Sequence, residues 1–189
     1  MKKVLLTMVA LAIMTSAAMA APVTDLQKGQ TTVGYTYWNP DVTSSSYDLG
    51  NTNANGFYAE TGLTENAIVG VETTSGSIYG MDVRFTDVTL KSKIGKNFQF
   101  IVGNRSYDDS YGSYSYSTSK FMYGLGAFTN LNDKTTAYAS ILHSDIADDS
   151  QVGVNYQVSK EFSLNLNYRD YSEDGFSLKG VGFSASYNF

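Results

Sequence analysis

Hydrophobic residues recur at every second position in ten separate stretches between residue 31 and the C-terminus. A period of two places successive side chains on opposite faces of a β-strand, and no stretch sustains the 3.6-residue period of an amphipathic helix. The pattern therefore predicts ten strands. Their alternating cores are Val33–Tyr37, Phe57–Leu63, Ala67–Val71, Val88–Leu90, Phe98–Val102, Phe121–Ala127, Ala137–Ile141, Val152–Tyr156, Phe162–Tyr168 and Val181–Phe189.

The connectors between these stretches alternate in length. Thr64-Glu65-Asn66 and Gly95-Lys96-Asn97 are examples of the short polar turns. The longer connectors cover residues 39–55, 75–79, 108–119, 144–150 and 172–177. Short turns on one side and longer loops on the other are typical of bacterial outer-membrane barrels, whose short turns face the periplasm. An even number of strands then places both termini on the short-turn side.

The polar face of the predicted strands collects glycine and charge. Its glycines are Gly34, Gly62, Gly70, Gly103, Gly124, Gly126, Gly153 and Gly182. A narrow closed barrel crowds its interior, whereas glycine only weakens a strand that faces water. The apolar face is nearly free of charge, as a lipid-facing surface must be. The sequence therefore predicts an all-β fold, a transmembrane antiparallel up-and-down β-barrel over residues 31–189.

Charged residues on the polar face are expected to lie in the lumen. They are Glu60, Glu72, Arg105 and Arg169, with Arg84 and Lys91 as further candidates. Buried charges are costly unless they are paired, so a salt-bridged plug is the first interpretation. A selectivity lining for a narrow pore is the alternative.

Aromatic residues on the apolar face are expected to form two girdles at the edges of the membrane. Phe98, Tyr156, Phe162, Tyr187 and Phe189 are assigned to the periplasmic girdle, and Tyr37, Phe57, Phe121, Tyr123 and Tyr168 to the outer one. Small aliphatic residues such as Val69 and Leu125 lie between them.

One segment departs from this scheme. Met81, Val83 and Phe85 alternate on one parity, whereas Val88 and Leu90 alternate on the other. A β-bulge near Thr86-Asp87 would reconcile the two. Alternatively, the upper part of the strand projects above the bilayer. Merging two strands into loops would give an eight-stranded barrel instead.

Composition narrows the class of protein. The 189 residues include no Cys, which excludes disulfide scaffolds, thiolate metal sites and Cys nucleophiles, and the net charge of −5 argues against nucleic-acid binding.

Residues 1–20 have a basic start, an apolar stretch and Ala18-Met19-Ala20 before the predicted cleavage site. This is the pattern of a signal peptide, which leaves residues 21–30 as a short periplasmic segment.

The C-terminal residues 182–189 end in Phe189, with Tyr187 on the same face. This ending resembles the signal by which the barrel-assembly machinery recognises outer-membrane barrels, although Ser184 stands where that pattern usually has Gly. With the signal peptide, the chain resembles small outer-membrane barrels of the opacity-protein, OmpA-membrane-domain and OmpX kind. The resemblance implies a bacterial outer-membrane location, with lipid, lipopolysaccharide and the assembly machinery as partners. Most members have eight strands.

Three function classes follow. A structural or adhesive surface protein is first, with Tyr- and Ser-rich residues 108–119 as the candidate contact. A narrow channel is second. A hydrolase at His143 is a remote third, because Ser144 would point to the opposite strand face. The acidic clusters are Asp108-Asp109, Asp145 with Asp148-Asp149, and Asp170 with Glu173-Asp174, and none has calcium-loop spacing. They are therefore expected to be solvated rather than to bind metal, with cation bridges to lipopolysaccharide as the alternative, and no cofactor is expected.

Overall fold

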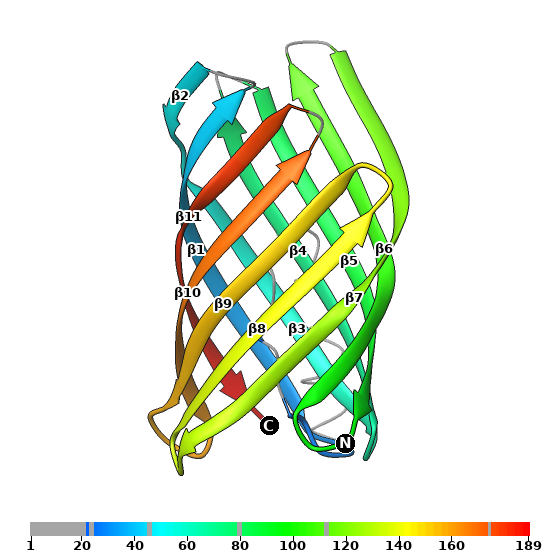
Figure 1. Ribbon diagram of the computed structural model, residues 1–189, viewed down its shortest axis with the longest axis vertical. Coiled ribbons are helices and arrows are strands. Elements are labelled where there is room, and N and C mark those ends of the chain that lie inside the picture. The colour runs from blue at the N-terminus through cyan, green and yellow to red at the C-terminus, as the bar shows by residue number, and fades with distance from the viewer. Residues whose placement is uncertain (1–21, 23–24, 45–46, 79–80, 112–113, 174) are drawn as a thin grey trace.

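The computed structural model describes residues 22, 25–44, 47–78, 81–111, 114–173 and 175–189, which form a closed β-barrel (Figure 1). The strands are β1 (Thr31–Ser44), β2 (Tyr47–Asn51), β3 (Ala54–Thr64), β4 (Ala67–Ile78), β5 (Met81–Ile94), β6 (Phe98–Tyr111), β7 (Tyr114–Asn132), β8 (Thr135–Ser144), β9 (Ala147–Gln157), β10 (Phe162–Glu173) and β11 (Phe176–Asn188). The barrel closes because β11 pairs antiparallel with β1. Short β2 pairs only with the upper end of β1, so ten strands form the wall. The ten-stranded prediction is confirmed, and the eight-stranded alternative is wrong.

The start of β1 and the C-terminal end of β11 lie at the lower end of the barrel as drawn in Figure 1, beside the short turns. The turn from β5 to β6 contains Gly95, whose φ of 70° lies in the left-handed region that favours glycine. Within the described residues, no helix of the length and hydrophobicity needed to cross a membrane occurs. The predicted signal peptide lies outside the described residues, so its removal stays a prediction.

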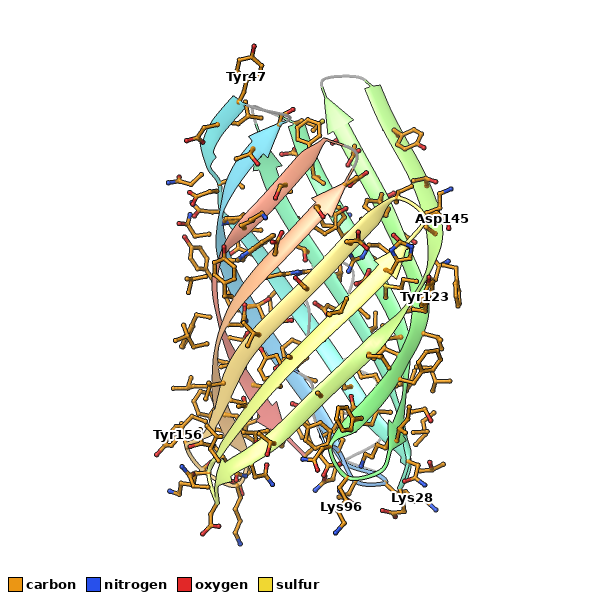
Figure 2. All side chains as sticks on the ribbon, in the orientation of Figure 1. Lys28, Tyr47, Lys96, Tyr123, Asp145 and Tyr156 are labelled. Carbon is orange, nitrogen blue, oxygen red and sulfur yellow. The ribbon has the colours of Figure 1, made fainter. Side chains whose placement is uncertain are left out.

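The lower part of the wall is apolar outside and mostly polar inside. Figure 2 shows Tyr123 and Tyr156 on the exterior at two different heights. All ten predicted girdle aromatics are on the exterior, each 37–60% exposed. On the inner face, polar residues such as Gln99, Asn165 and Ser184 are buried. This inside-out arrangement is that of a barrel whose wall meets lipid.

Large rings fill the lumen of this lower part, and glycines make room for them. A Cβ atom at Gly34 would lie 2.4 Å from the ring of Tyr58, and one at Gly153 would lie 2.6 Å from the hydroxyl of Tyr138. Both tyrosines are buried. The prediction that interior glycines reflect crowding is confirmed at these positions.

The upper part of the wall has the opposite polarity. Buried hydrophobic residues cluster inside it, with Phe85, Leu49 and Ile146 packed against them: Trp38, Val42, Ala54, Tyr107, Ala147, Tyr171 and Leu178. Outward positions there carry exposed polar residues such as Asp82, Ser172 and Lys179. We call this upper part the extension and the lower part the belt. The extension comprises residues 38–44, 47–54, 74–78, 81–87, 105–111, 114–120, 143–150, 169–173 and 175–180.

The extension corrects two expectations. The bulge near Thr86-Asp87 is absent, because β5 pairs with β4 and β6 without a shift in register. Its hydrophobic residues change parity because Phe85 faces the interior of the extension while Val88 faces the exterior of the belt. The second correction concerns the predicted long loops. Most of their described residues continue the strands, as in β6 and β7, which pair up to Tyr111 and Tyr114.

Candidate functional site in the barrel lumen

Two arginines and two aspartates cross the lumen at the base of the extension. From β6, Arg105 donates to Asp87 of β5 through Nε at 2.7 Å and Nη2 at 2.6 Å, and Nη2 also donates to Asp149 of β9 at 2.9 Å. From β10, Arg169 donates through Nε to the other oxygen of Asp149 at 2.8 Å. All four side chains are buried. We call this four-residue cluster the plug, because it joins β5 and β6 to β9 and β10.

The charges of the plug are balanced, which makes their burial tolerable. Two guanidinium groups face two carboxylates, and the paired N–H groups of Arg105 fit Asp87 in the bidentate geometry that favours Arg. Aromatic rings also contact the cations: Arg105 lies 5.7 Å from the ring centroid of Tyr171 and Arg169 lies 5.4 Å from that of Trp38. The plug is therefore held from several directions at once.

The other predicted lumen charges do not join the plug. Lys91 forms a buried ion pair with Glu60 in the belt, and Glu72 is also buried on the inner face. Arg84 is not in the lumen. With no bulge in β5, its odd-numbered neighbours face inward and Arg84 is exposed on the exterior. Its inclusion in the lumen network was wrong.

Sequence reasoning missed both carboxylates of the plug. Asp149 was assigned to a solvated acidic loop, and Asp87 to a bulge. Both assignments were wrong, because these residues lie in continuous strands and are buried. A parity count could have found them: Asp87 lies four positions before Lys91, and Asp149 lies two positions before Gln151, on the same strand faces.

Above the plug, the extension surrounds a partly open cavity of about 180 Å³. Aromatic and aliphatic side chains form most of its wall, including Trp38, Phe85 and Leu178. Among the described residues that line it, Asp109 and Glu173 carry charge. The carboxylate of Glu173 accepts a hydrogen bond of 2.5 Å from the hydroxyl of Tyr171. Partial burial and the neighbouring Asp108 both raise the pKa of Asp109.

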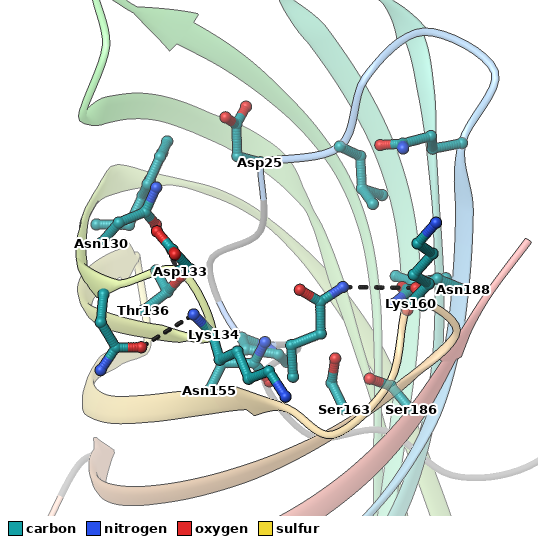
Figure 3. A pocket seen from close by; sticks show the side chains of 17 residues that line it. Asp25, Asn130, Asp133, Lys134, Thr136, Asn155, Lys160, Ser163, Ser186 and Asn188 are labelled. Atoms are coloured by element: carbon teal, nitrogen blue, oxygen red, sulfur yellow. Dashed lines mark hydrogen bonds between the residues drawn. The ribbon is translucent and has the colours of Figure 1, made fainter.

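Below the plug, at the end that holds the C-terminus, lies a polar cavity of about 550 Å³ (Figure 3). Lys134, Lys160 and Asn155 are among its lining residues. The described part of the predicted N-terminal segment, Pro22 and residues 25–30, reaches this end of the barrel, where Leu26 is buried and lines the cavity. Lys93 holds it by pairing with Asp25 at 2.5 Å and donating to the carbonyl of Leu26 at 2.9 Å.

His143 is exposed on the exterior of β8. Its Nδ1 lies 2.6 Å from Oδ1 of Asp148, and its ring contacts Tyr123 edge-on. Ser144 faces inward, where its buried hydroxyl donates to the carbonyl of Ala147 at 3.2 Å. The expectation that Ser144 and His143 lie on opposite faces is confirmed, so these two residues do not form a nucleophile–base pair.

Residues 108–119 form the end of the β6–β7 hairpin, with residues 112–113 outside the described part of the chain. Asp108 pairs with Ser117 and Ser110 with Ser115 in an unbroken antiparallel register. Tyr116 is 63% exposed. The described part of the segment is therefore a paired β-hairpin at the upper end of the barrel (Figure 1), and not the open loop that its composition suggested.

Comparison with known proteins supports the barrel fold. No family model and no curated protein sequence matches the chain. An outer-membrane channel from Pseudomonas putida F1 is similar over 90% of this chain and 99% of its own, with a TM-score of 0.50 at 10% identity. Two weaker similarities are to Ail of Yersinia pestis bound to the heparin analogue sucrose octasulfate and to the outer-membrane protease OmpT of Escherichia coli. The similarity to Ail covers 86% of this chain and 100% of Ail, with a TM-score of 0.46 at 15% identity. The similarity to OmpT covers 90% of this chain and 97% of OmpT, with a TM-score of 0.45 at 8% identity.

Proposed function

We propose that the protein is an integral outer-membrane barrel with a closed lumen, which presents the extension at the cell surface. The plug carries this proposal. Buried ion pairs connect four strands across the lumen, and the cavities above and below share no lining residue. The apolar exterior of the belt supports insertion into lipid. Lipopolysaccharide is the expected neighbour of the extension on the outer side.

A planar-bilayer recording tests the closed lumen. Wild-type protein should give no ion-conducting steps. Arg105→Ala removes the side chain that joins Asp87 to Asp149, so it should open measurable steps. Arg84→Ala is the matched control, because that arginine lies on the exterior and its loss should leave the bilayer silent. Regular ion-selective steps from the wild-type protein would favour the narrow channel and contradict the closed lumen.

Residues 108–119 are the part of the extension that we propose contacts a surface partner. Exposed tyrosine offers a large contact area at a low cost in conformational entropy. Tyr116→Ala should therefore weaken attachment of protein-coated beads to cells or matrix. Tyr47→Ala is the control, since Tyr47 is 75% exposed on the separate β2 strand (Figure 2). Equal attachment by the two variants would exclude the hairpin as the binding element.

The C-terminal aromatics are proposed to act in assembly. Tyr187 and Phe189 are both exposed, and their rings meet edge-on with centroids 5.0 Å apart. An exposed pair at the end of the last strand is available to the assembly machinery before the barrel closes. Phe189→Ala should reduce the amount of protein in the outer membrane of cells while leaving refolding into detergent unchanged. A refolding defect of the same size would assign Phe189 to stability instead.

A further inference from the structure

The cavity inside the extension combines features that the proposed structural role does not require. It holds about 180 Å³, slightly more than an apolar cavity of about 150 Å³ that is known to accept benzene. It therefore has room for a single aromatic ring with a short substituent. It also lies at the end of the barrel opposite the C-terminus, which is the outer side under the proposed orientation.

The aromatic side chains of the cavity wall contact one another and are hydrogen-bonded. Phe85 contacts Tyr107 edge-on at 5.1 Å between ring centroids and lies 5.4 Å from Tyr171. The hydroxyl groups of Tyr107 and Tyr171 share a hydrogen bond of 3.1 Å. Trp38 donates from Nε1 to the carbonyl of Gly180 at 3.1 Å. Because these rings are held by one another, little side-chain entropy would be lost when a flat molecule packs against them.

The charge that lines the cavity is negative. Asp109 and Glu173 contribute carboxylates, and among the described lining residues there is no Lys, Arg or His. No described side chain pairs with the carboxylate of Asp109, and partial burial together with the neighbouring Asp108 raises its pKa. The arginines beneath the cavity are already neutralised, because each is hydrogen-bonded to Asp149.

From this combination we infer that the cavity is a binding site for a small aromatic ammonium compound, with the ring against Phe85 and Trp38 and the ammonium group at Asp109. Apolar walls with one placed charge are the usual composition of a small-molecule site. An anion of the same size would face two carboxylates and should be rejected. The inference concerns the cavity alone and can fail without affecting the closed-lumen proposal.

The single tryptophan of the chain lines this cavity, so its fluorescence reports occupancy directly. Purified protein in zwitterionic detergent is titrated with benzylammonium chloride at constant ionic strength, with benzoate and benzyl alcohol as probes of the same shape. We expect a saturable change with benzylammonium and at least about tenfold weaker binding of the other two, which corresponds to about 1.4 kcal/mol.

Two variants separate the site from general effects of charge. Asp109→Asn should weaken benzylammonium binding about tenfold, whereas Asp108→Asn, which removes the neighbouring exposed charge, should change it less than twofold. Val83→Phe fills the cavity and should abolish heat of binding in calorimetry while the protein stays folded by circular dichroism. Equal binding of benzoate, an unchanged affinity in Asp109→Asn, or no saturable signal would each overturn the inference.

Discussion

In the lower part of β10, Leu166 faces outward and Asn167 faces the lumen, whereas in the upper part Ser172 faces outward and Tyr171 faces inward. The strand continues between the two parts without a break in its pairing. The backbone therefore forms the same antiparallel hydrogen bonds in both parts. The outward side chains differ: those of the belt are suited to lipid and those of the extension to water.

The plug lies where these two regions meet, and its loss should have the largest effect. Asp149→Ala leaves the buried Arg169 without its carboxylate partner and Arg105 with Asp87 alone, so the free energy of unfolding should fall by roughly 3–5 kcal/mol. Urea titration of protein folded in phospholipid vesicles measures this. Asp148→Ala removes the adjacent exposed carboxylate and should cost no more than about 1 kcal/mol. Similar losses in both variants would show that burial of the plug does not matter.

A charge introduced on the exterior tests whether the belt faces lipid and the extension faces water. Leu166→Arg places a cation on the belt and should cost about 2–4 kcal/mol if the residue lies near the bilayer midplane. Ser172→Arg places the same side chain on the same strand but on the extension, where it should cost less than about 0.5 kcal/mol. The two values come from the same vesicle titration. Equal costs would contradict the division into belt and extension.

The apolar interior of the extension can be weakened without touching the belt. Phe85→Ala removes a partly buried ring that packs on Tyr107 and Tyr171, which should cost about 2–3 kcal/mol. Amide hydrogen exchange should quicken in residues 81–87 and 105–111 and stay unchanged in the belt, because the extension can open locally. Arg84→Ala on the exterior of the same strand is the control. Faster exchange spread evenly over the barrel would mean that the two parts unfold as one.

The smallest effect is expected on the water-facing surface. Lys179 pairs with Asp170 at 2.8 Å, and this hydrogen bond raises the pKa of Lys179. A raised pKa means that any contribution is present while Lys is protonated and is lost as the pH rises through the folded-state value. Because both groups are solvated, Lys179→Ala should not shift the unfolding midpoint at neutral pH. A clear destabilisation would show that the pair is more shielded than its exposure indicates.

Sequence alone predicted the belt well, because alternation of constant parity is strong over Phe162–Tyr168 and Val181–Phe189. It failed in the extension, where the strands keep the same inward and outward positions but the hydrophobic residues move to the inward face and the polar residues to the outward face. Met81, Val83 and Phe85 were the visible sign of that change, and the projection alternative came closest to it. The partners of Arg105 could not be predicted, since strand register across the lumen depends on how the whole barrel closes.

The boundary between belt and extension is tested most directly by thiol labelling along β10 in lipid vesicles. The chain contains no cysteine, so each introduced thiol is the only one present. A membrane-impermeant thiol reagent should modify Ser172→Cys rapidly and leave Leu166→Cys unmodified, although both side chains face outward. Equal modification of the two positions, or protection of Ser172→Cys, would contradict the account.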